Sequence, residues 1–214
     1  MQEKNQLKNM RLIYERDQLL ESNIDKNPFV QFKLWFELVV KSEIVEPNAM
    51  TLATATKSGI PSARVVLLKK FDESGFTFFT NYGSRKGKEL LENPVAALLF
   101  WWKEFERQIR IEGKIEKISK NDSQAYFNVR PLKSRYGALA SNQSEVIDDR
   151  KILEDKFSDL GKKFGDNPPM PGNWGGYKLV PFKFEFWQGR RDRLHDRICY
   201  EKQNADWKIF RLQP

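Results

Sequence analysis

The feature that most constrains the fold is a run of short strand patterns separated by tight turns. Strand-forming residues occupy 50–56, 62–70 and 76–81, and glycine-containing turn signals at 57–59 and 72–75 separate them. Strands that follow one another through such turns pair as an antiparallel meander. Six or more short antiparallel strands with helices between them predict a mainly β chain with inserted helices, an α+β class, closed into a barrel. The later strands are predicted at 95–102, 107–118, 177–187, 197–203 and 207–212.

Helices are marked by capping residues between the strands. Asn27 and Pro28 suit the first turn of a packed helix that reaches about residue 42, and Ser84 suits the cap of a short helix that ends near Asn93. Further helices are predicted from Asn121 or Ser123 to 129, over 134–140 and over 148–164.

Two strand patterns predict which side chains are buried. The 95–102 run is almost entirely apolar, which predicts burial on both faces. In 182–187, apolar and polar residues alternate, so Phe182, Phe184 and Phe186 are expected on one buried face.

The N-terminal residues differ in character from the strand and helix patterns that follow. Residues 4–21 are charged and only weakly amphipathic, which is typical of a solvated arm or a marginal helix, and the pattern favours the arm. No linker divides the rest of the chain. The sequence therefore predicts an arm or helix over 1–27 and a single domain over 28–214.

Composition limits the partners and the compartment. A net charge of +8 with pI near 9.4 predicts an anionic partner, which is nucleic acid, a membrane surface or a phosphorylated small molecule. Cys199 is the only cysteine and His195 the only histidine, which predicts no disulfide, no metal site of the usual zinc type and a cytoplasmic location. The charged first residues and the lack of a long apolar run predict neither a signal peptide nor a membrane span.

A charged loop surrounds the single histidine. Arg190, Arg191, Arg193 and Arg197 lie within a few residues of His195 and repel one another unless an anion or carboxylates neutralise them. A solvated basic turn and an anion site that contains a histidine are both compatible with this pattern.

The residues around this loop carry a resemblance to a known family. Glu185-Phe186-Trp187-Gln188 is followed after four residues by Arg193-Leu194-His195-Asp196-Arg197. This spaced pattern resembles the C-terminal signature of the pyridoxamine 5′-phosphate oxidases, and the resemblance extends over 28–214. It implies an antiparallel split β-barrel that binds FMN and works as a homodimer. The implied reaction is oxidation of pyridoxamine or pyridoxine 5′-phosphate by oxygen to pyridoxal 5′-phosphate, with hydrogen peroxide and, from the amine, ammonia.

The resemblance also implies a set of flavin-binding residues. An arginine suits a phosphate through its planar fork, and an amide suits the uracil-like edge of a flavin. The segment Gly83–Lys88 fails the Walker spacing but opens a helix, and both an ordinary capped basic helix and a phosphate site at the helix N-terminus are compatible with it. The implied flavin contacts are Arg64, Val65, Val66, Leu67, Leu68, Lys69, Phe79, Thr80, Arg85, Lys86, Gln108, Gln143, Ser144, Trp187 and Arg197.

A second implied set binds the substrate. Tyr126 and Arg130 are four residues apart and share a helical face, and Pro131 places Arg130 at the end of that helix. Arg193 and His195 are the catalytic candidates, and both are expected to orient the substrate ring rather than to act as an obligate base. The implied substrate contacts are Arg11, Tyr14, Lys69, Tyr126, Arg130, Ser134, Arg193, Leu194 and His195.

Two other classes of protein are compatible with parts of the sequence. A basic β-barrel that binds nucleic acid would expose aromatic residues between basic ones, whereas Phe76, Phe78 and the 182–186 phenylalanines have core-type alternation. A different split-barrel flavoprotein, or a flavin- or haem-binding protein without this oxidase activity, need not carry the C-terminal signature.

Overall fold

A computed structural model describes residues 12–214. The described chain divides into two compact units. Unit 1 contains the chain up to Pro47, Leu99–Ile111 and Phe182–Pro214, and unit 2 contains Asn48–Leu98 and Glu112–Pro181. Three strands contribute residues to both units, and the predicted single domain over 28–214 stays a prediction.

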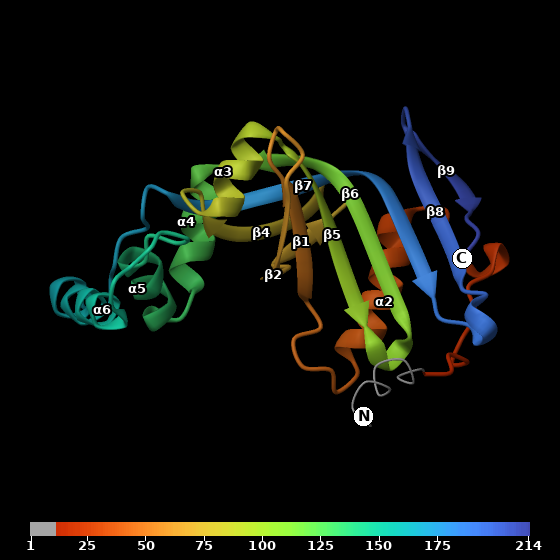
Figure 1. The fold of residues 1–214 in the computed structure, drawn as a ribbon, viewed down its shortest axis with the longest axis horizontal. Coiled ribbons are helices and arrows are strands. Elements are labelled where there is room, and N and C mark those ends of the chain that lie inside the picture. Colours follow the sequence, from red (N-terminus) through yellow and green to blue (C-terminus); the bar gives the residue numbers. More distant parts are fainter. Residues whose placement is uncertain (1–11) are drawn as a thin grey trace, which may run out of the picture. The chain divides into compact units, whose positions relative to one another are not determined.

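Helices are inserted between groups of consecutive strands, as the sequence predicts (Figure 1). Hydrogen bonds connect the strands in the order β2-β1-β5-β6-β7-β4-β3, with β8 paired to β7 and β9 to β8. The pairs β1–β2, β3–β4, β4–β7, β7–β8 and β8–β9 are antiparallel. The strands are β1 (Ala49–Ala55), β2 (Pro61–Leu67), β3 (Lys70–Asp72), β4 (Gly75–Asn81), β5 (Val95–Trp102), β6 (Arg107–Lys117), β7 (Trp174–Gln188), β8 (Asp196–Gln203) and β9 (Asp206–Arg211). The helices are α2 (Pro28–Val40), α3 (Arg85–Glu92), α4 (Lys120–Val129), α5 (Leu132–Ala140) and α6 (Arg150–Phe164).

The predicted strand over 62–70 is two strands. The backbone N–H of Leu68 donates to Asn48, beside β1, at 2.9 Å, whereas the N–H of Lys69 donates to Thr77 of β4 at 2.9 Å. The chain thus changes its pairing partner between two adjacent residues. A change of partner leaves no hydrophobic signal in the sequence, and for this reason the prediction of one strand was wrong.

Two burial predictions were also wrong. In β5, Val95 and Trp101 are each 45% exposed, so burial alternates instead of covering both faces. In β7, Phe182 is 41% exposed, while Phe184 and Phe186 are fully buried. The buried positions change from odd-numbered to even-numbered residues between Pro181 and Phe184, where pairing with β4 has ended and pairing with β8 begins.

Helix α2 and the strands around it form the core of unit 1. Asn27 caps α2, because its side-chain oxygen accepts from the N–H of Phe29 at 2.9 Å, as predicted. Phe29 packs edge-on against Phe184 with ring centroids 5.4 Å apart, and Trp35 packs edge-on against Phe186 at 5.3 Å. Buried aromatic pairs of this kind stabilise the core beyond their area alone.

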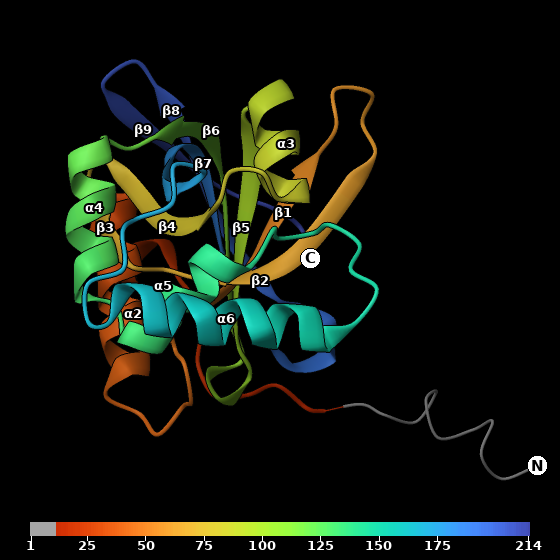
Figure 2. The same ribbon diagram turned by 90° about the vertical axis from the view of Figure 1, so that its left-hand side faces the viewer.

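The boundaries of the unit 2 helices follow their actual caps. Ser84 caps α3 as predicted, but α4 begins after Ser119 rather than after Asn121 or Ser123, since the Ser119 hydroxyl accepts from the N–H of Asp122 at 3.0 Å. Helices α5 and α6 lie side by side in Figures 1 and 2, and Tyr136 contacts Phe157 with ring centroids 5.7 Å apart.

Residues 12–20 contain no helix, which favours the arm over the marginal helix for the described part of this segment. Most residues of the arm are exposed, as predicted for a solvated arm, but Leu19 is only 4% exposed and anchors it. Its N–H donates to Asp196 at 3.0 Å, and its carbonyl accepts from Arg211 at 2.8 Å.

Candidate functional site

A cavity of about 580 Å³ in unit 2 gathers most of the predicted flavin and substrate residues of that unit. It lies between β2, β4, the end of α4 and the start of α5. Leu68, Arg85 and Ser144 are not among its lining residues; Leu68 is buried and only 4% exposed. The cavity is lined by Arg64, Val65, Val66, Leu67, Lys69, Phe79, Thr80, Lys86, Tyr126, Arg130, Pro131, Ser134, Gln143 and Trp174.

One corner of this cavity presents a buried lysine at the start of α3. Lys86 is 8% exposed, and its Nζ donates to the side-chain oxygens of Thr80 at 3.2 Å, Gln143 at 3.2 Å and Ser84 at 3.4 Å. All three partners are neutral. Burial, and then the charge of Arg64, lower the pKa of Lys86. A helix N-terminus with a desolvated cation beside it is suited to a phosphate.

Glu89 holds the two arginines of this region. Its carboxylate is 3% exposed and pairs with Arg64 at 3.3 Å and Arg85 at 2.9 Å. Burial by itself raises the pKa of the Glu89 carboxyl, but hydrogen bonds from Ser62 and Thr54, followed by Arg85, outweigh it and lower the pKa to about 2. Glu89 was not among the predicted site residues, although Arg85 and Glu89 stand at helical i,i+4 spacing.

The opposite end of the cavity is aromatic. The rings of Phe79 and Tyr126 stack with centroids 3.9 Å apart, and Phe79 stacks on Trp174 at 5.5 Å. Trp174 was missed because the predicted strand began at residue 177, whereas β7 begins at Trp174, which pairs with Asn81. Planar walls of this kind suit a planar ring.

A cation without a full set of partners lies beside this aromatic wall. The Arg130 guanidinium is 4.7 Å from the centre of the Trp174 ring, and its NH1 atom is buried with no hydrogen-bond partner. Burial lowers the pKa of Arg130. Its backbone is extended at the end of α4, as Pro131 predicts. A buried guanidinium N–H that lacks an acceptor is unfavourable unless an anion or water supplies one.

The remaining predicted site residues lie in unit 1, and those around His195 share a second cavity. This cavity has a volume of about 750 Å³ and is lined by Leu12, Ile13, Tyr14, Arg190, Arg191, Asp192, Arg193 and His195. Trp187 and His195 have ring centroids 4.6 Å apart, and Tyr14 lies 5.9 Å from each. Leu194 is 69% exposed and lines a neighbouring cavity. Arg11 lies outside the described residues.

A backbone hydrogen bond decides which ring nitrogen of the neutral His195 carries the proton. Its Nδ1 accepts a hydrogen bond from the N–H of Arg190 at 3.1 Å, so the proton of the neutral ring is on Nε2. Burial, and then the charge of Arg193, lower the pKa of His195, while Asp196 acts in the opposite direction. The ring is therefore a neutral hydrogen-bond donor through Nε2, which agrees with an orienting role better than with that of a base.

Arg197 is held by a buried carboxylate. The guanidinium of Arg197 donates to the Glu185 carboxylate through Nε at 3.2 Å and NH2 at 3.0 Å, and Arg110 donates to the same carboxylate at 2.7 Å. The hydrogen bond that Arg197 donates to Glu185 raises the pKa of Arg197. Cys199, the register partner of Glu185 on β8, is fully buried, and burial followed by the Glu185 charge raises the pKa of its thiol to about 11. Gln108 is half-buried on β6.

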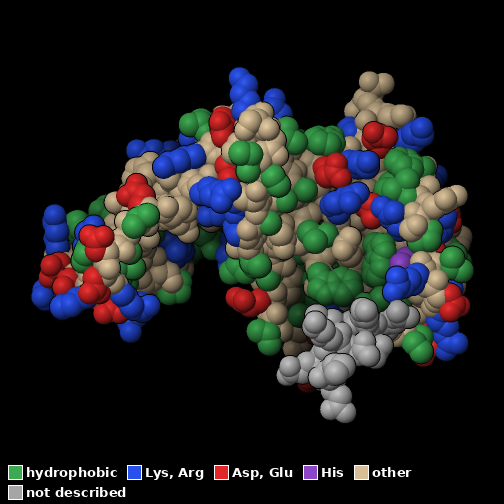
Figure 3. Space-filling model, viewed as in Figure 1, with side chains coloured by type: hydrophobic (Ala, Val, Ile, Leu, Met, Phe, Trp, Pro, Cys, Tyr) green, Lys and Arg blue, Asp and Glu red, His purple; other side chains and the backbone are tan. Residues whose placement is uncertain are grey.

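Charge is mixed rather than single-signed on the visible face of unit 2. Basic and acidic side chains are interspersed over α6 in Figure 3, where Arg150 pairs with Glu154 and Lys151 with Asp155. Within residues 12–214, no cluster of three or more His, Cys, Asp or Glu could hold a metal ion. No helix of this part of the chain is long and apolar enough to cross a membrane. The predicted cytoplasmic location and the absence of nucleic-acid partners stay predictions.

Comparison with family models gives two matches. Residues 37–163 match the family described as pyridoxamine 5′-phosphate oxidase. Residues 174–214 match the region described as the pyridoxine 5′-phosphate oxidase C-terminal dimerisation region.

Curated relatives match over nearly the whole chain. A pyridoxine/pyridoxamine 5′-phosphate oxidase from Burkholderia mallei (strain SAVP1) is 55% identical over 211 residues, which cover 97% of this chain and 99% of the relative. A protein of the same name from Nostoc punctiforme is 54% identical over 207 residues, which cover 96% and 97% respectively.

Solved structures agree with the fold. PhzG from Burkholderia lata 383, in complex with tetrahydrophenazine-1-carboxylic acid, is 34% identical with a TM-score of 0.87, over 92% of this chain and 98% of PhzG. A pyridoxamine 5′-phosphate oxidase-related, FMN binding protein from Nostoc punctiforme PCC 73102 is 17% identical with a TM-score of 0.70, over 88% and 98%. The predicted fold class, mainly β with inserted helices and of the split-barrel type, is confirmed by this similarity.

Proposed function

Because the chain belongs to the pyridoxamine 5′-phosphate oxidase family, we propose that it is an FMN-dependent oxidase of phosphorylated vitamin B6. In this proposal, the C4′ amine of pyridoxamine 5′-phosphate or the C4′ alcohol of pyridoxine 5′-phosphate is oxidised to the aldehyde of pyridoxal 5′-phosphate. Oxygen is reduced to hydrogen peroxide, and the amine also consumes water and releases ammonia. Curated relatives at 55% identity that carry this name support the proposal.

The observation that carries the proposal is the presence of two cationic corners, one at Lys86 and one at Arg130, in one cavity of unit 2. Lys86 with its neutral oxygen partners forms one corner, and Arg130 with an unpartnered buried NH1 contributes to the other. Lys69 and Ser134 also line the cavity and are suited to the second corner. Two phosphate-bearing molecules, a mononucleotide cofactor and a phosphorylated substrate, account for both corners.

FMN fits the residues of the first corner. A buried cation at a helix N-terminus, beside the hydroxyl of Thr80 and the side-chain amide of Gln143, is suited to a phosphate monoester. FMN, when bound, supplies the electron acceptor of the reaction. Lys86, Thr80 and Gln143 would hold its phosphate, and Arg64 would complete the set.

The chain's own residues bind and orient the substrate. Arg130, Lys69 and Ser134 hold the substrate phosphate, and Tyr126 supplies both a hydroxyl and part of an aromatic wall. His195 donates a hydrogen bond from Nε2, and the flanking Arg193 adds positive charge for the oxygen substituent of the ring. No residue acts as a nucleophile in this scheme.

A homodimer is the proposed active unit. The match of residues 174–214 to a dimerisation region supports it, as does the general prevalence of two-fold dimers. The family resemblance implies that both subunits contribute to each flavin site.

Turnover of pyridoxine 5′-phosphate tests the proposed function. The purified protein, saturated with FMN, is expected to produce pyridoxal 5′-phosphate and hydrogen peroxide in equal amounts, and to use unphosphorylated pyridoxine poorly. No turnover of either phosphorylated B6 vitamer by the FMN-loaded protein would reject the proposal.

The PhzG similarity favours one alternative substrate class. PhzG is 34% identical, and its structure contains a tetrahydrophenazine carboxylic acid, so oxidation of a reduced phenazine carboxylate is the second candidate. The two candidates differ in their need for Arg130, since a ring carboxylate does not require the phosphate corner. A parallel assay with a reduced phenazine carboxylate and with pyridoxine 5′-phosphate separates them.

A further inference from the structure

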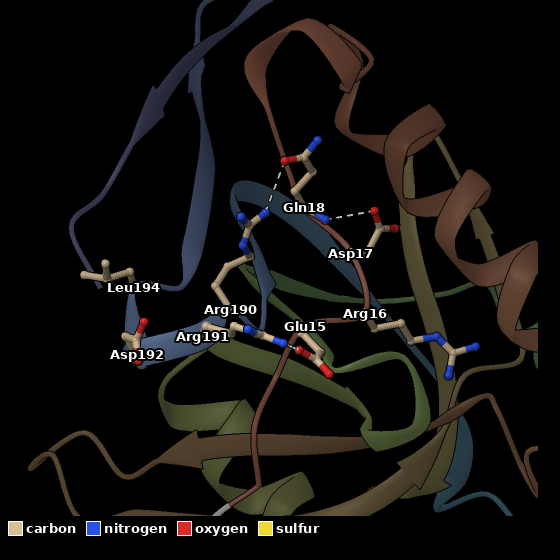
Figure 4. Close-up of a pocket in the computed structure, with 8 residues that line it drawn as sticks. All are labelled: Glu15, Arg16, Asp17, Gln18, Arg190, Arg191, Asp192 and Leu194. Atoms are coloured by element: carbon tan, nitrogen blue, oxygen red, sulfur yellow. Dashed lines mark hydrogen bonds and ion pairs between the residues drawn. The ribbon is translucent and has the colours of Figure 1, made fainter.

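Residues 12–21 lie across the loop that carries His195. Arg190 reaches Gln18 at 3.3 Å, and Arg191 pairs with Glu15, as the close-up in Figure 4 shows. These residues line a cavity of about 680 Å³ together with Asp17 and Leu194. Side chains of the N-terminal segment (residues 12–21) therefore contact side chains of the histidine loop (residues 189–195).

Arg107 connects this segment to the strand that precedes the loop. The residue is 7% exposed, and its guanidinium carbon lies 4.3 Å from the centre of the Trp35 ring. Its NH2 donates to Asp17 at 2.5 Å, and its Nε donates to the side-chain oxygen of Gln188 at 2.8 Å. One buried guanidinium therefore binds an N-terminal residue and the last residue of β7 at once.

Gln188 is in turn fixed on its other side. It is fully buried, and its amide nitrogen donates to the carbonyls of Phe105 at 3.2 Å and Glu106 at 3.3 Å. The next residue, Gly189, donates its N–H to Glu106 at 2.8 Å and has no room for a side chain, because a Cβ would lie 2.8 Å from the ring of Tyr14. The start of the loop is therefore set by Arg107 and by the N-terminal segment together.

The loop itself is in an unfavourable backbone conformation. Asp192 and Arg193 are consecutive residues with positive φ, 55° and 62°, although neither is a glycine. Such residues cost free energy and persist only where the surroundings hold them. At the far end of the loop, Asp196 accepts from the N–H of Leu19 at 3.0 Å and from Arg211 at 2.7 Å. The N-terminal segment thus contacts both ends of the loop.

We propose that Arg107 is a positioning residue, which acts through Asp17 and Gln188 to hold the N-terminal segment and the 189–195 loop in the one arrangement in which Nδ1 of His195 accepts from Arg190 and its Nε2–H is the group that orients the substrate. Arg107 does not itself touch the substrate in this proposal. The proposal rests on the proposed function for the identity of the substrate, but not for the geometry of the loop.

The chain offers a direct reporter for this proposal, because His195 is its only histidine. Nitrogen NMR of the imidazole in the FMN-loaded protein is expected to show a single neutral tautomer with the proton on Nε2. The test variants are Asp17→Asn, Arg107→Met and the double variant. Met retains much of the contact with Trp35. Asp17→Asn removes the charge that pairs with Arg107 and keeps the size of the side chain. Arg150→Met is the matched control, since Arg150 forms an exposed ion pair on α6.

The expected results separate positioning from a merely structural role. In the Arg107→Met and double variants, the imidazole signals become those of mixed tautomers, and kcat/KM for pyridoxine 5′-phosphate falls by about tenfold with FMN content unchanged. Asp17→Asn leaves a buried cation without its counter-ion and lowers Tm by several degrees. The double variant regains part of the lost Tm, whereas its kcat/KM and imidazole signals do not return to those of the wild type. Arg150→Met changes none of these three quantities.

Two results would overturn the proposal. Wild-type imidazole signals in both Arg107→Met and the double variant would show that the loop does not depend on Arg107. Losses of kcat/KM that recover together with Tm in the double variant would show that Arg107 stabilises the fold only. If the wild-type protein does not oxidise pyridoxine 5′-phosphate at all, the proposed function fails, while the imidazole signals still test the positioning.

Discussion

At the scale of single residues, Glu89 connects stability to the candidate cofactor site. Its carboxylate is buried between the hydroxyls of Thr54 and Ser62 and the guanidinium groups of Arg64 and Arg85. A buried carboxylate with this many donors stays ionised in the folded chain, whereas in the unfolded chain it has an ordinary pKa.

The first prediction concerns stability in acid. The pKa of Glu89 is about 2 in the folded chain, below its usual value of 4.5. The ionised Glu89 carboxylate contributes about 3 kcal/mol to the free energy of unfolding. This contribution is fully present above pH 4.5 and is lost as the pH falls toward 2. Urea unfolding at pH 7, 5, 4 and 3 is expected to show that Glu89→Gln is less stable at pH 7 and loses less stability in acid. The exposed Glu154→Gln is the control, and equal acid losses in both variants would contradict the prediction.

The second prediction concerns Arg130. A charge-assisted hydrogen bond contributes about 1.5–3 kcal/mol, so Arg130→Ala is expected to lower kcat/KM for pyridoxine 5′-phosphate by about ten- to a hundredfold. FMN content should not change, and the small turnover of unphosphorylated pyridoxine should fall little. Lys133→Ala, on the first turn of α5 and exposed, serves as the control. An equal loss on both substrates would show that Arg130 does not bind the phosphate.

Residue roles could be predicted only in part from the sequence. The family signature led to Arg64, Lys86, Tyr126 and Arg130, which the structure brings into one cavity. Arg107 was missed because its partners Asp17 and Gln188 come from distant parts of the chain and leave no local signal. Trp174 was missed because the strand was predicted to begin too late, and Glu89 was missed despite its i,i+4 spacing from Arg85. The flavin and substrate roles themselves stay predictions.

At the scale of elements, capping residues located the starts of two helices, although the cap of α4 is Ser119 and not Asn121 or Ser123. Asn27 and Ser84 begin α2 and α3 as predicted, since a cap acts within three residues. The predicted strand over 62–70 and the burial pattern at Phe182 were wrong, because both depend on which strand lies alongside.

A third prediction tests the start of α3. A Cβ on Gly87 would lie 2.1 Å from the carbonyl oxygen of Tyr82, so Gly87→Ala must displace the helix turn that carries Lys86. The expected result is a destabilisation of about 1–3 kcal/mol and FMN binding weakened by about tenfold, measured by thermal unfolding and fluorescence titration. Gly161→Ala in α6 is the matched control, because a Cβ there meets nothing within 4 Å. The control variant should bind FMN like the wild type and have a slightly more stable helix α6. Unchanged FMN binding in Gly87→Ala as well would contradict the prediction.

At the scale of the whole molecule, the order of strands and helices and the fold class could be predicted from the sequence. Periodicity and turn residues decide these features locally, and the confirmed split-barrel class follows from them together with the family signature. Assembly cannot be read from periodicity. The homodimer was implied by the family resemblance, and the match of residues 174–214 to a dimerisation region supports it.

The fourth prediction tests this assembly. Light scattering on the FMN-loaded protein is expected to give twice the 25.2 kDa mass of the chain, and dilution to the monomer should release FMN and abolish turnover. A monomer that retains FMN and full activity at assay concentration would contradict the homodimer.

The burial of Cys199 has a practical consequence for such measurements. A thiol that is inaccessible and whose pKa is raised to about 11 reacts slowly with maleimides at neutral pH. The chain contains no other cysteine, so a cysteine introduced on the exposed surface of α6 would be the one rapidly labelled position. The natural sequence therefore already serves as the unreactive background for single-site fluorescent or spin labelling. A labelled homodimer would report one inter-label distance, without any prior removal of native thiols.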